Sequence, residues 1–161
     1  MCGIVGIASN KNCVPDILSG LKVLEYRGYD SSGIACSENN DLTYNKAFGK
    51  ISSLIHQLKD NKLQGNTSIG HTRWATHGKP SSINAHPFVK KNCALVHNGI
   101  IENHDDLISS HYINRNNLHS QTDTEVVAEI YSTLLDEYNP IEALISLMSK
   151  VEGTYAFAFL V

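Results

Sequence analysis

The second residue of the chain, Cys2, has the side chain best suited to covalent chemistry. A thiolate is a strong nucleophile, whereas an unperturbed thiol is mostly protonated at neutral pH and needs a base. Removal of Met1, which the small size of Cys2 favours, would leave a free α-amine with a pKa of about 8 that can accept the proton. Taken alone, a Met-Cys start equally suits a small apolar residue that opens a strand.

The turn-like sequence His97-Asn98-Gly99 follows an apolar run and offers hydrogen-bond donors. Acyl transfer requires donors aimed at a developing oxyanion. The side-chain N–H of Asn98 and the backbone N–H of Gly99 are candidates, and glycine permits close approach of the backbone. The alternative is an ordinary hairpin, because Asn-Gly is a strong signal for a two-residue turn.

Two charged residues suit an amino-acid substrate, which carries both a carboxylate and an ammonium group. Arg73 is the candidate for the carboxylate, since guanidinium binds carboxylates through two parallel hydrogen bonds. Asp123 is the candidate for the ammonium group, with capping of a helix as its alternative role. Trp74, the single tryptophan, lies beside Arg73 and would cover a small ligand or else pack in the core.

Eight histidines raise the question of a metal, but none of them stands in a metal-ligand spacing such as H-E-x-x-H. We therefore expect no metal and no other cofactor. Lys and Arg form no run, and the net charge is −3, so we expect no nucleic-acid surface. The four cysteines form no C-x-x-C pair, and no apolar segment approaches the ~20 residues of a membrane span. These features predict a cytoplasmic protein with reduced thiols and no membrane partner.

Hydrophobic periodicity predicts a mixture of strands and helices in one domain over residues 1–161. The fold class is α+β with largely antiparallel sheet, because tight turns join neighbouring strands. A capping box at Thr122–Glu125 predicts the start of a helix. Residues 68–87 are expected to be irregular, and the chain ends on an apolar strand, as a piece of a longer protein would. The other predicted strands are 4–8, 34–36, 42–48, 93–96 and 154–161, and the other helices are 15–27, 51–58 and 140–148.

Four blocks of sequence together resemble the glutaminase domain of the glutamine–fructose-6-phosphate aminotransferases. The glutaminase domains of that family belong to the N-terminal-nucleophile (Ntn) hydrolases and to the class II glutamine amidotransferases. The resemblance covers nearly the whole chain, and the blocks appear in the same order. The blocks are Cys2-Gly3-Ile4-Val5-Gly6, Arg27-Gly28-Tyr29-Asp30-Ser31-Ser32-Gly33, residues 71–87 and residues 96–104, with Thr122-Asp123-Thr124-Glu125 in support.

The resemblance implies a four-layer αββα sandwich of antiparallel sheets, which this chain would leave incomplete at its C-terminus. It implies that Cys2 is the nucleophile and that its own amine is the base. Asn98 and Gly99 would form the oxyanion hole. The implied residues around glutamine are Arg73, Thr76, His77 and Asp123, with Trp74 in a closing flap, His86 supporting that flap and Arg27 near the nucleophile.

The resemblance also implies a partner for the ammonia that glutamine hydrolysis releases. In that family a pair of sugar isomerase domains follows, where fructose 6-phosphate becomes glucosamine 6-phosphate, and the full-length enzyme is expected to be a homodimer. Two other functions stay open at this point. One is a domain that binds L-glutamine without turnover, and the other is a different Ntn hydrolase, such as an acylase with the same thiol.

Overall fold

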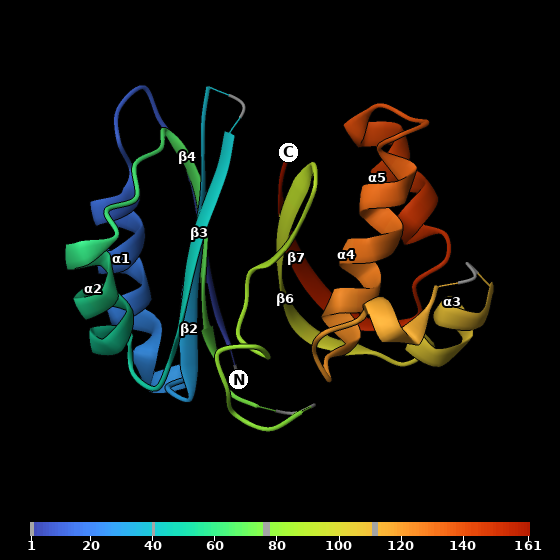
Figure 1. Ribbon diagram of the computed structural model, residues 1–161, viewed down its shortest axis with the longest axis horizontal. Coiled ribbons are helices and arrows are strands. Elements are labelled where there is room, and N and C mark those ends of the chain that lie inside the picture. Colours follow the sequence, from blue (N-terminus) through green and yellow to red (C-terminus); the bar gives the residue numbers. More distant parts are fainter. Residues whose placement is uncertain (1, 40, 76–77, 111–112) are drawn as a thin grey trace.

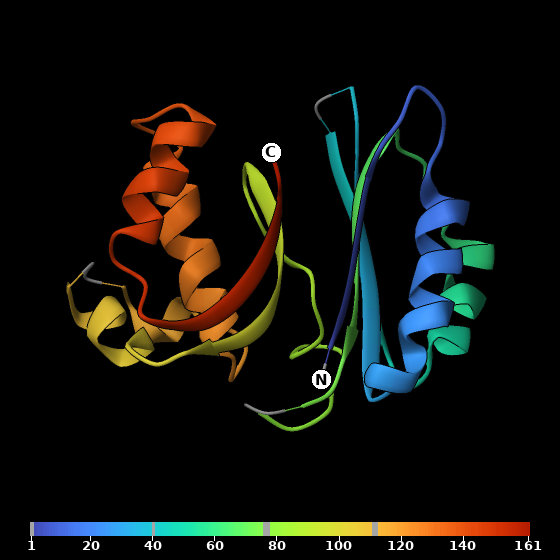
Figure 2. The same ribbon diagram turned by 180° about the vertical axis from the view of Figure 1, so that it is seen from behind.

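The computed structural model describes residues 2–39, 41–75, 78–110 and 113–161. Two antiparallel sheets lie face to face, and helices cover the outer face of each sheet, so that the order of layers is helix, sheet, sheet, helix (Figure 1). Figure 2 shows the same four layers from behind. The predicted αββα sandwich of antiparallel sheets is confirmed.

The first sheet has four strands in the order β1-β4-β2-β3 and is covered by α1 and α2. Pro15 lies in the first turn of α1, and Ile17 and Leu21 are buried one helical turn apart. This spacing gives the helix the apolar stripe that packs on the sheet. The bounds are β1 (Gly3–Ala8), α1 (Val14–Leu24), the 3-10 helix η1 (Glu25–Arg27), β2 (Ser31–Glu38), β3 (Asp41–Phe48), α2 (Ile51–Asp60) and β4 (Thr67–Arg73).

The second sheet has three strands in the order β5-β6-β7 and is covered by α3, α4 and α5. Asn139 caps α5, because its side-chain oxygen accepts hydrogen bonds from the backbone N–H groups of Ile141 and Glu142. The bounds are β5 (Phe88–Lys90), β6 (Cys93–Ile101), α3 (His104–Ser110), the 3-10 helix η2 (Arg115–Asn117), α4 (Asp123–Leu134), α5 (Pro140–Met148) and β7 (Gly153–Leu160).

Three of the sequence predictions about these elements are wrong. Residues 68–73 are not irregular, because they belong to β4, which pairs with β1 and β2 on its two sides. His97-Asn98-Gly99 is not a turn, because β6 continues through it to Ile101 in register with β7. The capping box is also incomplete: α4 begins after Thr122 as expected, but the Thr122 side chain makes no capping hydrogen bond.

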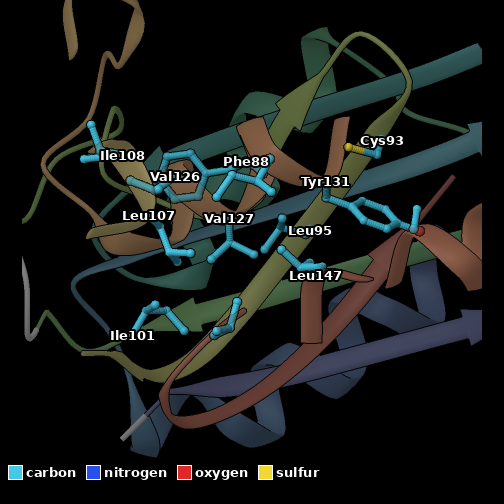
Figure 3. Packing of buried hydrophobic residues seen from close by; sticks show 14 residues of the cluster. Phe88, Cys93, Leu95, Ile101, Leu107, Ile108, Val126, Val127, Tyr131 and Leu147 are labelled. Atoms are coloured by element: carbon cyan, nitrogen blue, oxygen red, sulfur yellow. The ribbon is translucent and has the colours of Figure 1, made fainter. Parts of the chain in front are cut away.

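The apolar core is divided among the three spaces between layers. The largest cluster packs between the second sheet and its helices, where Leu95 and Ile101 meet Val127, Tyr131 and Leu147 (Figure 3). A second cluster lies between the first sheet and its two helices. The space between the sheets holds a smaller cluster that consists of Ala35, Ile69, Ala94, Val96 and Leu160.

Within the described ranges, none of the helices is long and apolar enough to cross a membrane.

Candidate active site

A cavity of about 350 Å³ opens at one end of the space between the two sheets. Its walls come from the residue before β1, the end of β4, the segment before β5, the second half of β6, the start of α4 and the start of β7. Segments distant in sequence therefore meet at one place. Seven of the predicted site residues line the cavity: Cys2, Arg73, Trp74, His86, Asn98, Gly99 and Asp123.

Cys2 lies next to the end of β4, and its thiol is in contact with the backbone of Trp74. The Trp74 N–H donates to the Cys2 Sγ over 3.4 Å, and the Sγ is 3.6 Å from the Trp74 carbonyl oxygen. Burial raises the pKa of the Cys2 thiol, and the Trp74 hydrogen bond and the Arg73 charge oppose this rise without cancelling it. The thiol is therefore protonated at neutral pH and needs a base before it can attack a substrate.

Asn98 brings a side-chain amide from the second sheet to Cys2, the predicted nucleophile, beside the first sheet. Its Nδ2 donates to the backbone carbonyl of Cys2 over 3.3 Å. The next residue, Gly99, has a φ of +140°, and a Cβ on it would lie 1.9 Å from the Thr154 carbonyl oxygen on β7. Only glycine adopts this conformation readily in so little space. The glycine therefore determines the backbone path of β6 at the residue beside Asn98.

Arg73 is the last residue of β4, and it is 3% exposed. Burial lowers the pKa of the guanidinium, and the negative charges of Asp30 and Asp123 oppose that shift. An arginine stays protonated in a protein even so. The cavity thus contains a permanent cation. The backbone of Arg73 is closely packed against Gly28, because a Cβ on Gly28 would lie 2.7 Å from the Arg73 carbonyl carbon.

Asp123 is the first residue of α4 and lies beside the end of β6. Its Oδ2 accepts a hydrogen bond from the backbone N–H of Ile101 over 2.8 Å, and the residue is 6% exposed. The carboxylate therefore joins the start of α4 to the end of β6. It supplies the one acidic side chain among the described residues that line the cavity.

Trp74 marks the outer edge of the site. Its side chain is 45% exposed and makes an edge-to-face contact with Tyr29, with ring centroids 5.3 Å apart. Asp30 holds the adjoining backbone, because its carboxylate accepts a hydrogen bond from the Ala75 N–H and its own N–H donates to the Arg73 carbonyl. Tyr29 and Asp30 belong to a block that carried the family resemblance, but the sequence assigned neither of them a role.

Five further residues line the cavity without having been predicted as site residues: His97, Ile100, Thr122, Thr124 and Thr154. Thr122 and Thr124 flank Asp123, so the motif around Asp123 was a signal for both of them. Thr154 lies on β7, and only the pairing of β7 with β6 brings it to the cavity. No local pattern in the sequence could reveal that contact.

Three predicted site residues are not placed in the cavity. Arg27 ends η1 and is not among the described residues that line the cavity. Thr76 and His77 lie outside the described residues, so their predicted contact with a substrate stays a prediction. In the described part of the chain, no group of three or more His, Cys, Asp and Glu side chains is arranged to hold a metal ion.

A larger cavity, of about 590 Å³, lies elsewhere, between β3 and β5. Lys46, Lys90 and Glu125 line it together with apolar and neutral polar residues. None of the predicted site residues is among those that line it. The smaller cavity contains the predicted nucleophile and the charges expected for an amino acid, so it is the candidate active site.

Comparison with known protein families shows which family the chain belongs to. The family model described as "Glutamine amidotransferase domain" matches residues 71–161. A glutamine–fructose-6-phosphate aminotransferase (isomerizing) of Mesorhizobium japonicum is 46% identical over 99% of this chain and 26% of its own length. A protein of the same name from Clostridium acetobutylicum is 44% identical over 97% of this chain and 26% of its own length. The chain thus spans about a quarter of the length of these relatives.

Solved structures share the fold. Glutamine phosphoribosylpyrophosphate amidotransferase from B. subtilis, solved with ADP and GMP, superposes with a TM-score of 0.81 and 28% identity over 100% of this chain and 35% of its own. A glutamine aminotransferase class-II domain protein from Silicibacter pomeroyi superposes with a TM-score of 0.62. Its identity is 15%, over 99% of this chain and 72% of its own, so it supports the fold alone.

Proposed function

Because the chain belongs to the glutamine amidotransferase domain family, we propose that it hydrolyses L-glutamine to glutamate and ammonia with Cys2 as the nucleophile. The observation that carries this proposal is the position of the Cys2 thiol. It lies in one cavity with a buried guanidinium, a buried carboxylate and the Asn98 amide. Nucleophile, charge recognition and a potential oxyanion donor are the parts that an amidohydrolase for an amino acid needs.

The two charges define how glutamine would bind. We assign Arg73 to the α-carboxylate and Asp123 to the α-ammonium group, which leaves the side-chain amide to extend toward Cys2. Trp74 would cover the bound substrate, and His86 would support the segment that carries it. Thr76, His77 and Arg27 are assigned to the same site by the family resemblance. Pairing both charges of a zwitterion favours a free amino acid over the acyl chain that an acylase would bind.

The reaction would proceed through two acyl transfers. After Met1 is removed, the α-amine of Cys2 accepts the thiol proton, and the thiolate attacks the amide carbon of glutamine. Asn98 Nδ2 and the Gly99 N–H donate to the oxyanion of the tetrahedral intermediate. The C–N bond then breaks, the amine returns its proton to the leaving nitrogen, and ammonia departs. Water, deprotonated by the same amine, attacks the thioester, and its cleavage yields glutamate and the free thiol.

We further propose that residues 1–161 are the glutaminase domain of a longer enzyme that aminates fructose 6-phosphate. The support is the identity of 46% and 44% to proteins named glutamine–fructose-6-phosphate aminotransferase. In such an enzyme, sugar isomerase domains would receive the ammonia and form glucosamine 6-phosphate for amino-sugar biosynthesis. We also propose that the whole enzyme is a homodimer, as the family resemblance implies. We place it in the cytoplasm, where thiols stay reduced, since the four cysteines are all free.

The nucleophile is tested by mass spectrometry after incubation with 6-diazo-5-oxo-norleucine, a reactive analogue of glutamine. We expect one adduct, mapped to Cys2, on chains that lack Met1, and we expect excess glutamine to block it. The buried thiols of Cys13, Cys36 and Cys93 serve as internal controls. A Cys2→Ser variant should form no adduct. A processed, folded chain that is not labelled at Cys2 would contradict the proposal.

The acceptor is tested separately, in the protein at its full natural length. Incubation with glutamine and fructose 6-phosphate should yield glucosamine 6-phosphate and glutamate in equal amounts. Release of glutamate without any amino sugar would leave glutamine hydrolysis standing and overturn the proposed acceptor. Binding of glutamine without any glutamate would favour a sensing role instead.

A further inference from the structure

Three buried histidines and one threonine form a polar layer at the candidate active-site cavity, and all of them but His71 line it. His71, His86, His97 and Thr124 are each at most 4% exposed. They come from four different segments: β4, the segment before β5, β6 and α4. The ring centroids of His71 and His86 lie 4.2 Å apart. A layer that joins four segments in this way constrains how those segments sit relative to one another.

The hydroxyl of Thr124 is the centre of this layer. Thr124 Oγ1 lies 3.0 Å from His86 Nε2 and 3.0 Å from His97 Nδ1. It also lies 3.4 Å from Asp123 Oδ1. A hydroxyl has one proton and two lone pairs, so it can donate to one of these neighbours only. At least one imidazole must therefore donate its own N–H to the hydroxyl, and the contacts act as a set.

A second contact extends the layer to the first sheet. His71 Nε2 lies 2.9 Å from the His97 carbonyl oxygen, and a carbonyl can only accept, so His71 is the donor. Burial lowers the pKa of His71 to about 3, and it lowers the pKa of His86 well below the ordinary value. Both rings are therefore neutral at physiological pH. Each then has one N–H and one lone pair, which suits a layer with fixed donor and acceptor roles.

Each neighbour of the Thr124 hydroxyl is attached to a group with a proposed role in the reaction. His97 directly precedes Asn98 and Gly99, and Asp123 directly precedes Thr124. His86 lies next to the end of the segment that begins with Trp74 and leads to β5. The hydroxyl thus links the oxyanion donors, the carboxylate for the substrate ammonium group and the covering segment.

We propose that Thr124 is a positioning residue for glutamine hydrolysis, because its hydroxyl sets the relative placement of β6, the start of α4 and the His86 segment. This inference rests on the proposed function. Reactions of this type depend steeply on geometry, and a misplacement of about 1 Å can lower the rate about 100-fold. Removal of the hydroxyl should therefore reduce turnover by more than its effect on folding explains.

The test compares Thr124→Val with Thr124→Ser in the protein at its full natural length. Valine has the shape of threonine without the hydroxyl, whereas serine keeps the hydroxyl. We expect Thr124→Val to lower kcat/KM for glutamine by about 10- to 100-fold, mainly through kcat, and Thr124→Ser to stay within about twofold of the wild type. Thr133→Val, on the exposed face of the same helix, is the matched control and should leave both kinetic constants unchanged.

A second readout separates positioning from mere stability. Nitrogen chemical shifts of the imidazoles report the tautomers of His86 and His97, and we expect Thr124→Val to change them while Thr124→Ser does not. Should Thr124→Val fail to fold, Thr124→Ala removes the hydroxyl without adding a buried methyl group. Equal kinetic constants in a folded variant without the hydroxyl would overturn the inference. A wild-type enzyme that does not hydrolyse glutamine would instead overturn the proposed function, and this inference with it.

Discussion

At the scale of a single residue, Gly99 determines the backbone path of β6 at the proposed oxyanion donors. Its φ is +140°, and a Cβ there would lie 1.9 Å from the Thr154 carbonyl oxygen, so the position has room for hydrogen alone. We expect Gly99→Ala to lower the free energy of unfolding by about 2 kcal/mol from backbone strain, and to abolish glutamine hydrolysis even in the folded fraction. Urea unfolding and a glutaminase assay at saturating glutamine measure the two effects.

Gly6 offers the matched control for that substitution. It lies on β1, is exposed, and a Cβ there would meet only Ile69 Cγ2, at 3.9 Å. Gly6→Ala should therefore leave the unfolding free energy within about 0.5 kcal/mol of the wild type and preserve activity. If both variants lost activity equally, the special geometry at Gly99 would not be the cause.

At the scale of the elements, β4 makes the free energy of unfolding depend on pH, because it places the His71 ring where water cannot hydrate it. Its pKa is about 3 in the native state against an ordinary value of 6.5. Between these values the unfolded chain binds more protons than the native one, so stability falls as the pH is lowered through this range. We expect His71→Gln, which keeps an N–H for the His97 carbonyl, to reduce this loss by about 1.4 kcal/mol per pH unit.

Urea unfolding at about pH 7 and about pH 5 checks the expectation. His56→Gln makes the same change on the exposed face of α2 and should leave the slope with pH as it is in the wild type. A wild-type protein whose unfolding free energy is equal at both pH values would contradict the burial of neutral histidines. So would a His71→Gln variant with the wild-type slope.

Elements with regular apolar spacing were predictable from the sequence, and those built around buried polar residues were not. The helices at 51–60 and 140–148 and the strand at 153–160 agree with their predictions because an apolar face determines each of them. In β4 both faces are buried, and they carry polar side chains that include Ser68, His71 and Thr72. Such a strand is recognisable only from its neighbours on both sides. The same reason explains why the sequence predicts a strand over 93–96 only, whereas β6 continues to Ile101.

The sequence predicts the residues of the candidate site more completely than it predicts the bounds of the strands that carry them. Cys2, Arg73, Asn98 and Asp123 follow from the chemistry that a zwitterionic amide requires, and the cavity brings them together. Thr124 was not singled out, because a threonine in the first turn of a helix has an ordinary local explanation. Its contacts with His86 and His97 arise from tertiary structure alone.

At the scale of the whole molecule, the two larger apolar clusters lie under the helices, away from the space between the sheets where the cavity opens. We therefore expect substitutions in these clusters to affect stability more than catalysis. Ile17 is fully buried between α1 and the first sheet, on the side away from the cavity. We expect Ile17→Ala to lower the free energy of unfolding by about 2–5 kcal/mol. The kcat per folded molecule should stay within about twofold, because the inner faces of the sheets are untouched. Denaturation and an active-site titration with the glutamine analogue provide the two numbers.

Ile141 is the counterpart at the surface, since it lies on α5 with 71% of its area exposed. Ile141→Ala should change the unfolding free energy by at most about 0.5 kcal/mol. A large drop in kcat for Ile17→Ala molecules that remain folded would mean that the helical layers and the cavity are coupled more tightly than the separate clusters imply.

The hydrogen bond from Asn98 to the Cys2 carbonyl joins residues 96 positions apart and spans the two sheets. During synthesis the thiol therefore leaves the ribosome long before its partner. Under the proposed mechanism, a growing chain that carries Cys2 but not yet Asn98 lacks an oxyanion donor, so it should not hydrolyse glutamine. The proposed site is complete only when the second sheet has packed on the first, so glutamine hydrolysis by a newly made molecule should begin only after both sheets have folded.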